Sequence, residues 1–540
     1  MHKHNTQTLR TSVSLTFPLL GHSMRVALAT TTDSGQLRHR FARRSRIRPM
    51  RKTCLAVIAA VLATTAPFSA QDKVDFAVIE KIKAEGMDRS KVLETFDQLT
   101  TVIGPRLTNS PAHKRAVAWT QETLKAWGMS EVHAEPFQFG RGWTLDKVSV
   151  EMVEPRYMPM IGYPKGWSPP TAGRIVAAPV LLAGLDADAV KAQAGKLKGA
   201  IVMTTAVMDY AIRADRPVAS GDLKPPQPAP SVRPPQLNAE RLAALKAEGV
   251  GVTIEPNIGE HGTVFVTGRD LGANSVPAIV LATEHYNLIA KMVQQKIPVK
   301  LAVEVQARFN EDDRNTHNVI AEIPGTDNAL KDEVVMIGAH LDSWHTGTGA
   351  TDNADGVSTT MEAMRILKAL GVRPRRTIRL ALWAGEEQGL LGSKAYVDQH
   401  FAGDKNKAAR DKLSVYFNFD NGYPPVTGFY MEGNDPARKI MEEWLKPVAS
   451  LGAIMPSPGN IGATDHLSFL AVGLPGFQAV QEYVNYDVRT HHTNADFAER
   501  IDPAALKQAS IVIATVVYQA AMRDGTFPRP APPKPATSKQ

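Results

Sequence analysis

Apolar positions in residues 309–525 predict strands and helices in regular succession. Three near-continuous apolar runs are typical of strands buried on both faces of a sheet, at 333–339, 377–384 and 414–419. Two helices are expected from apolar residues at a period near 3.6, at 356–370 and 503–523. This alternation predicts an α/β fold.

The chain before residue 309 contains two regions with different sequence patterns. Residues 71–170 begin with helical patterns, broken at Gly104-Pro105-Arg106, and continue as strands and turns. Residues 171–308 alternate short β-rich runs with helical stretches around a Pro-rich loop. We therefore predict that 171–308 is an inserted β-rich domain and that 71–170 and 309–525 form the two parts of the main domain. A disordered tail rich in proline is expected over 526–540.

The basic charge of the chain is concentrated at its N-terminus. The first 71 residues hold 11 of the 62 Lys and Arg residues and one of the 54 acids, so residues 72–540 carry 51 bases, 53 acids and a net charge of −2. This balance removes the support for a nucleic-acid partner.

Residues 50–70 have the pattern of a secretory signal peptide. Two basic residues after Met50 precede an apolar stretch, Cys54–Ala63, which small residues follow. The stretch is shorter than the ~20 residues of a membrane span. We expect a secreted or periplasmic protein with no stable membrane span after signal cleavage, and residues 1–49 to precede the true start codon. An uncleaved anchor and an unusually long leader are the alternatives.

Cys54 is the single cysteine of the chain and lies within this signal. The mature chain then has no disulfide, no thiol nucleophile and no thiolate metal site. Any metal ion must be held by His, Asp and Glu.

Polar motifs close the predicted buried strands or lie in loops beside them. They are His340-Leu341-Asp342, Asp352-Asn353-Ala354-Asp355-Gly356, Glu386-Glu387, Asp420 and the downstream His491–Asp496. Ligands of open α/β sheets gather at the carboxyl ends of the strands, so these side chains are expected in one crevice. Imidazole and carboxylate groups are zinc ligands, and two metal ions can share one carboxylate. Any one of these motifs alone would be weak evidence, but the ordered set predicts a two-metal site.

This ordered set, with W-A-G-E-E-Q-G (383–389), Thr464-Asp465-His466 and His492-Thr493, resembles the di-zinc exopeptidase family over about 72–525. That family includes bacterial leucyl aminopeptidase, glutamate carboxypeptidase and carboxypeptidase Q, and the stretch from His340 to Gly389 is most similar to the last. The insert at 171–308 resembles the protease-associated domain that members often carry.

The resemblance implies a mixed sheet flanked by helices, two Zn²⁺ ions and a role for each motif residue. Asp352 would bridge the ions, and its peptide bond to Asn353 would be cis. The implied ligands are His340 and Asp420 for one ion, Glu387 and His492 for the other, and Asp352 for both. The implied catalytic residues are Glu386, the general base that activates water, and Asp342, which orients His340.

Several assignments stay open at this point. His491 and His345 compete with His492 as ligands, whereas His466 is expected outside the ligand set. Tyr483 and Tyr486 are both candidates for stabilising the oxyanion.

A metal-dependent exopeptidase acting on a peptide or dipeptide is therefore expected, with aminopeptidase favoured. A dipeptidase or carboxypeptidase of the carboxypeptidase Q type is the main alternative, for which Arg489 could bind a substrate carboxylate. A receptor-like binding protein and a one-metal glutaminyl cyclase are disfavoured because the ligand set is complete. The sequence predicts no oligomeric state.

Overall fold

The computed structural model describes residues 74–182, 187–208, 215, 216, 219, 237–259 and 261–530. The predicted upstream segment 1–49, the predicted signal peptide 50–70 and the last ten residues of the predicted tail, 531–540, lie outside the described residues.

A large mixed sheet confirms the predicted α/β class. In the described chain its eight strands run in the order β1 (Ser130–Gln138), β11 (Asn315–Ile323), β13 (Thr377–Trp383), β12 (Val334–His340), β14 (Leu413–Asn418), β17 (Gly476–Glu482), β15 (Tyr423–Tyr430) and β16 (Met455–Ser457). The inner strands β13, β12, β14 and β17 are parallel neighbours. Their carboxyl ends therefore meet at one edge of the sheet.

Side chains that alternate along β12 enter two different apolar cores. Val335, Ile337 and Ala339 belong to one core, whereas Met336 belongs to another. Because both faces of the strand are covered, its sequence is continuously apolar rather than alternating.

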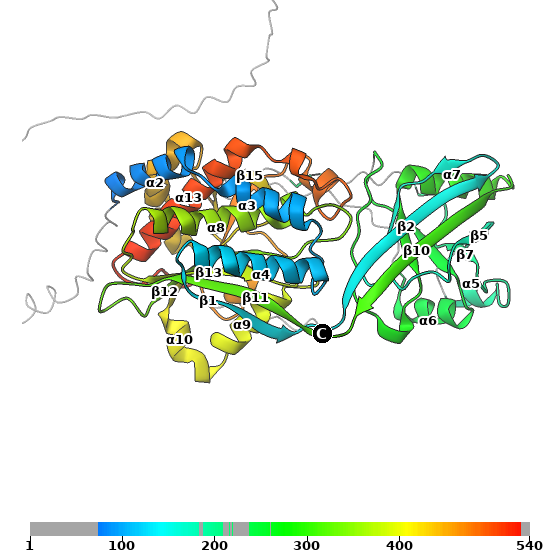
Figure 1. Ribbon diagram of the computed structural model, residues 1–540, viewed down its shortest axis with the longest axis horizontal. Helices are drawn as coiled ribbons and strands as arrows, with labels where there is room; N and C mark the ends of the chain where they lie inside the picture. Colours follow the sequence, from blue (N-terminus) through cyan, green and yellow to red (C-terminus); the bar gives the residue numbers. More distant parts are fainter. Residues whose placement is uncertain are drawn as a thin grey trace, which may run out of the picture. The chain divides into compact units, whose positions relative to one another are not determined.

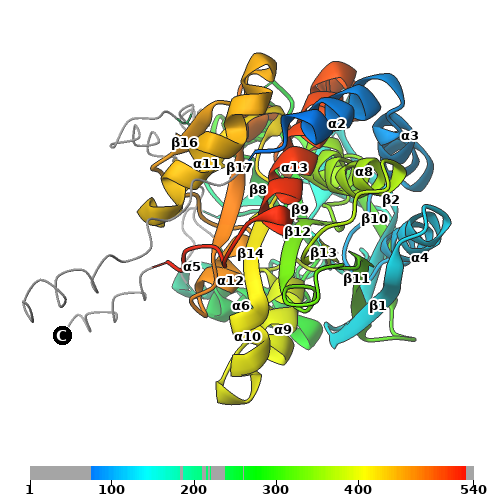
Figure 2. The same cartoon turned by 90° about the vertical axis from the view of Figure 1, so that its left-hand side faces the viewer.

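Helices supply the other side of each core, and Figure 2 shows α8 and α13 on one side of the sheet and α9 on the other. The first core includes residues of α2 (Phe76–Asp88), α3 (Val92–Asp97), α4 (Pro111–Ala126), α8 (Asp355–Ala369), α11 (Arg438–Leu445) and α13 (Pro503–Met522). The second core includes residues of α9 (Leu391–His400) and α12 (His466–Leu470). The short α10 (Lys407–Lys412) precedes β14.

Helix α13 is long and apolar enough to cross a membrane, with a mean hydropathy of 1.3. However, 89% of its apolar window is buried inside the fold. It is the central helix of the first core.

The described residues between 142 and 310 form two smaller sheets, here called the smaller lobe, in which β2 and β10 run side by side (Figure 1). One sheet has the order β3 (Met158–Pro159), β2 (Gly142–Glu154), β10 (Lys300–Asn310) and β5 (Ile175–Ala177). The other has the order β4 (Gly162–Pro164), β9 (Ala278–Leu281), β8 (Val252–Pro256), β7 (Ile201–Met203) and β6 (Pro179–Leu181). The α-helices among the described residues of the lobe are α5 (Ala187–Lys191), α6 (Ala239–Ala247) and α7 (Thr283–Gln294).

The smaller lobe begins earlier than the predicted insert at 171–308. Strand β2 pairs with β10 from Gly142 opposite Asn310 to Glu154 opposite Lys300, and not with the large sheet. Its sequence would suit a strand of either sheet, and its partner lies far along the chain, so the local pattern did not identify the boundary.

Phe527 lies within the region predicted as a disordered tail, yet it is buried. Its ring packs against Trp444 at 5.4 Å and Phe477 at 5.4 Å between centroids. The described chain therefore continues as part of the first core beyond residue 526.

Candidate metal centre

The residues that the sequence predicted as ligands meet at the carboxyl edge of the large sheet. His340 ends β12, Glu387 follows β13, and Asp420 follows β14. His492 lies in the loop beyond β17. The four segments thus come from the ends of four adjacent parallel strands, which brings them together in space.

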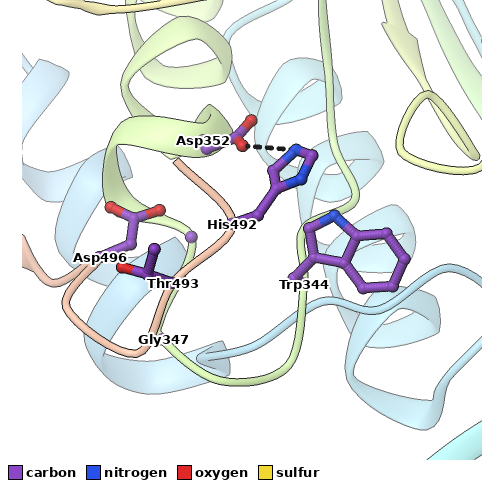
Figure 3. Close-up of a pocket in the computed structure, with 7 residues that line it drawn as sticks. Trp344, Gly347, Asp352, His492, Thr493 and Asp496 are labelled. Carbon is purple, nitrogen blue, oxygen red and sulfur yellow. Dashed lines mark ion pairs between the residues drawn. The ribbon is translucent and has the colours of Figure 1, made fainter. Parts of the chain in front are cut away.

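Asp352 lies at the middle of this group, just before α8. Its Oδ1 is 3.2 Å from His340 Nε2, and its Oδ2 is 3.4 Å from His492 Nε2. Figure 3 shows the Asp352–His492 pair beside Trp344. The Asp352–Asn353 peptide bond is cis, as predicted. Each oxygen of one carboxylate therefore faces a different imidazole, the arrangement required of a bridging ligand.

Each imidazole faces one further carboxylate. His340 Nε2 is 3.4 Å from Asp420 Oδ1, and His492 Nε2 is 2.9 Å from Glu387 Oε2. These contacts pair the four outer side chains as the predicted ligand sets do. The side chain of His492 is 17% exposed and that of His340 is fully buried, so solvent reaches the His492 end of the group.

The orientation of His340 is set by the other nitrogen of its ring. Nδ1 donates to the carbonyl oxygen of Asp342 at 3.0 Å, while the Asp342 carboxylate is farther away, at 3.7 Å. That carboxylate instead accepts a hydrogen bond from Thr108 Oγ1 at 2.6 Å and one from the backbone N–H of Glu386 at 3.3 Å. The backbone carbonyl of Asp342 thus orients the His340 ring, and the carboxylate of Asp342 holds the backbone of Glu386.

The polar atoms of this group fit a metal ion. His340 Nε2, Asp352 Oδ2 and both carboxylate oxygens of Glu387 are buried without a hydrogen-bond partner. With its proton on Nδ1, His340 would present a lone pair to two carboxylates, which is unfavourable unless a cation lies between them. The set contains only imidazole and carboxylate donors, which zinc accepts.

Burial and mutual charge shift the pKa values of these groups. Burial would lower the pKa of His340, but Asp420 and the other nearby carboxylates raise it well above its ordinary value. Burial raises the pKa of Glu386 and of Glu387 well above the usual carboxyl range, and the carboxylates around them add to this. So many acids in one buried place are stable only if positive charge is added.

Arg106 belongs to the site, although its sequence pattern indicates only a break between helices. It is fully buried and donates to the carbonyl oxygens of Leu341 at 2.9 Å, Thr348 at 2.8 Å and Gly349 at 2.9 Å. These carbonyls belong to the loop that joins His340 to Asp352. The Gly-Pro-Arg sequence carried no signal for this role because the contacts are long-range.

The other candidate histidines occupy different places. His345 donates from Nε2 to the carbonyl oxygen of Pro164 at 2.9 Å, so its ring is held by the smaller lobe and not by the ligand set. His466 is buried 3.3 Å from Glu432. His491, in contrast, has a ring nitrogen close enough to Asp352 and His492 to hold an ion with them. It therefore stays an alternative ligand.

The smaller lobe reaches the His492 loop directly. The backbone N–H of Val266 donates to the carbonyl oxygen of His492 at 2.9 Å, and the ring of Phe265 stacks on the His492 imidazole at 5.1 Å. The lobe therefore forms part of the wall of the metal centre.

Comparison with known proteins identifies the catalytic part of the chain. Residues 318–517 match the profile of "Peptidase family M28". These residues are an M28 peptidase domain. They carry all the predicted ligands and Glu386, so the predicted resemblance to the di-zinc exopeptidases is confirmed for this part of the chain.

Relatives of the M28 domain include both predicted kinds of exopeptidase. Carboxypeptidase Q of Mus musculus is 27% identical over 446 residues, which are 82% of this chain and 88% of the mouse protein. An aminopeptidase of Pseudomonas aeruginosa is 34% identical over 37% of this chain and 34% of its own length. The prediction of a metal-dependent exopeptidase is confirmed at this level.

The fold has a solved counterpart over most of its length. A peptidase M28 precursor from Shewanella amazonensis is 27% identical, with a TM-score of 0.65, and the match covers 85% of this chain and 99% of the solved chain. The M28 domain and the smaller lobe are therefore both found in a solved structure of this kind.

Proposed function

We propose that the chain is an exported exopeptidase that holds two zinc ions between His340, Asp352, Glu387, Asp420 and His492. The observation that carries the proposal is the position of Asp352, whose two oxygens face two different imidazoles. When bound, the ions would polarise the scissile carbonyl group and lower the pKa of a nearby water molecule toward ~7.

Glu386 is the proposed general base. It is next to the ligand Glu387, but no ion pair joins it to the ligand histidines within the described residues. Its carboxylate would take a proton from the attacking water and then deliver it to the leaving amine. The hydrogen bond from its backbone N–H to Asp342 fixes the backbone that carries it.

Tyr486, rather than Tyr483, is the proposed donor to the developing oxyanion. The Tyr483 hydroxyl is paired with that of Tyr430 at 2.9 Å. The Tyr486 hydroxyl is buried without a hydrogen-bond partner, and Asp352 and Asp420 add to the effect of burial in raising its pKa. A buried donor with no partner beside the ligands is suited to a hydrogen bond made only when substrate is present.

The end of the peptide that is recognised has two candidates. An aminopeptidase is the sequence-based expectation. A dipeptidase of the carboxypeptidase Q type is supported by the length of the sequence match. Mouse carboxypeptidase Q matches 82% of this chain, whereas the Pseudomonas aeruginosa aminopeptidase matches 37%. The signal-like pattern at 50–70 supports export in either case.

Hydrolysis of three substrates tests the proposal: an aminoacyl chromogenic amide, an unblocked dipeptide and an N-blocked peptide. Each is measured on native protein, after chelation and after return of zinc, with two equivalents of zinc expected by metal analysis. Cleavage of the amide restored by zinc supports the aminopeptidase, and cleavage of the dipeptide alone supports the dipeptidase. Folded, zinc-loaded protein that cleaves none of them would refute the proposal.

A further inference from the structure

Two residues of the smaller lobe, Asp215 and Arg216, bind the loop that leads to His492. This loop, Tyr483–Thr490, follows β17 and is here called the 483–490 loop. The lobe and the loop lie far apart in sequence, since Asp487 comes 271 positions after Arg216.

Arg216 is engaged on every side of its guanidinium group. Nε and Nη2 donate to the two carboxylate oxygens of Asp487 at 2.8 Å and 2.7 Å, and the backbone N–H of Arg216 adds a third bond to Asp487 at 2.9 Å. Nη1 donates to Asn421 Oδ1 at 3.1 Å. The guanidinium also lies over the rings of Tyr483 and Tyr486, at 4.9 Å and 5.6 Å from their centroids. Planar, bidentate pairing of this kind fixes direction as well as distance.

Neighbouring residues strengthen the attachment. The two carboxylate oxygens of Asp215 accept hydrogen bonds from the backbone N–H groups of Asn485, at 2.6 Å, and Val488, at 3.1 Å. Ala219 is buried in a small apolar cluster with Tyr430 and Val480 of the large sheet. The described residues of this part of the lobe therefore all contact the peptidase domain.

Both partners of Arg216 lead to the metal centre. Asn421 donates from Nδ2 to Asp420 Oδ2 at 3.0 Å, so it holds a proposed ligand. Asp487 lies next to Tyr486 in the 483–490 loop, and His491 and His492 follow directly. One guanidinium thus connects the segment after β14 with the loop after β17.

We propose that Arg216 is a positioning residue of the active site, supplied by the smaller lobe, which holds Tyr486 and the His491-His492 pair in place through Asp487. Its guanidinium nitrogens are committed to Asp487 and Asn421, so it is not a free cation for a substrate carboxylate. The consequence for turnover rests on the proposed function, whereas the consequence for the loop does not.

The chain offers a matched control for this residue. Arg141 makes the same bidentate pair with Asp270, at 2.7 Å and 2.6 Å, lies over the ring of Phe309 and has a side chain 21% exposed, against 22% for Arg216. Its partners, however, are not in the 483–490 loop. Arg141→Ala removes an equivalent bidentate pair, together with a contact to Glu311 at 3.2 Å, and leaves the contacts of Arg216 with the 483–490 loop intact.

Hydrogen–deuterium exchange of the metal-free protein tests, without reference to activity, whether Arg216 holds the 483–490 loop. In Arg216→Ala, amides of the 483–490 loop should exchange ~10-fold faster or more, because local opening loses its charged hydrogen bonds. Arg216→Lys, which keeps the charge but not the fork, should fall between this variant and wild type, and Arg141→Ala should match wild type in this loop. If Arg216→Ala does not fold, Arg216→Lys gives the result. Unchanged exchange in the loop, or equal acceleration in Arg141→Ala, would overturn the proposal.

Steady-state kinetics of the zinc-loaded protein give the second readout. We expect kcat of Arg216→Ala to fall about 10- to 100-fold, as for other small displacements of catalytic groups, with a smaller change in KM and with zinc content retained. Wild-type kcat in a variant whose loop exchanges faster would overturn the positioning role. If the wild-type protein cleaves no peptide, the proposed function fails. Hydrogen–deuterium exchange of the 483–490 loop still decides whether Arg216 holds that loop in place.

Discussion

Replacement of Arg106 by lysine should damage both the stability and the metal centre of this protein. Arg106 is fully buried and donates to five backbone carbonyl oxygens, those of Leu99, Gly104, Leu341, Thr348 and Gly349, at 2.8–3.1 Å. Three of these carbonyls are in the loop between His340 and Asp352. Gly349 and Leu99 also accept from the backbone N–H groups of Ala354 and Gly104. The carbonyl oxygens of Gly104, Leu341 and Thr348 therefore depend on Arg106.

The size of the effect follows from the number of donors. A lysine ammonium has three donors and cannot reach five carbonyls from one position. Nε reaches Leu341 whereas Nη1 reaches Gly104 and Thr348, and a single ammonium cannot occupy both places. At least one buried acceptor would lose its partner, so the free energy of unfolding should fall by about 1–3 kcal/mol or more. The displaced loop should also weaken zinc binding, because His340 and Asp352 flank it.

Denaturant unfolding of metal-free protein, with zinc titration of the same samples, measures both effects. Arg308→Ala is the control, since it breaks an exposed bidentate pair with Asp146 and should lower the free energy of unfolding far less than Arg106→Lys. If Arg106→Lys unfolds within the error of wild type and binds zinc equally well, the assigned role of the buried guanidinium is refuted.

Three further outcomes are expected. Glu386→Gln should keep its zinc, measured by metal analysis, and lose about 100- to 10,000-fold in kcat; retention of a tenth of wild-type activity would contradict its role as base. Tyr486→Phe should lower kcat about tenfold without lowering the unfolding midpoint, because the hydroxyl has no partner in the folded protein, and unaltered kcat would exclude the proposed donor. Burial lowers the pKa of His345 to about 4 from an ordinary 6.5, so its contribution to stability is complete above pH 6.5 and is lost as pH falls toward 4, where the unfolded chain binds the proton first. His345→Gln should therefore make the acid-induced loss of stability of metal-free protein shallower by up to about 3 kcal/mol, and an identical pH profile would contradict this.

The parts of the molecule that sequence predicted well are those governed by local pattern. Buried parallel strands show themselves as apolar runs, and the polar residues directly after those runs must lie at one sheet edge. The sequence pattern alone therefore predicts that His340, Glu387 and Asp420 lie close together. Helices α8 and α13 likewise follow from apolar spacing within a single segment.

The parts that sequence did not predict depend on contacts between distant segments. The start of the smaller lobe was misplaced because the partner of β2 lies at the other end of the lobe. Arg106 acts on Leu341, which is 235 positions away, and Arg216 acts on Asp487 across 271. Phe527 is in a composition typical of disorder but finds an aromatic pocket made by α11 and β17. In each case the local sequence carries no distinctive pattern, and only the contact with a distant segment shows what the residue does.

The smaller lobe leaves and rejoins the chain at adjacent points. Strands β1 and β11, which precede and follow it, pair with each other up to Gln138 opposite Asn315, and the lobe itself opens and closes at Gly142 opposite Asn310. The lobe is thus a single excursion on a two-stranded stalk, which could be exchanged for that of a relative without cutting the large sheet. Such an exchange would replace Arg216 and Phe265 together while keeping every proposed ligand, so evolution could vary the surroundings of the metal centre and its chemistry separately.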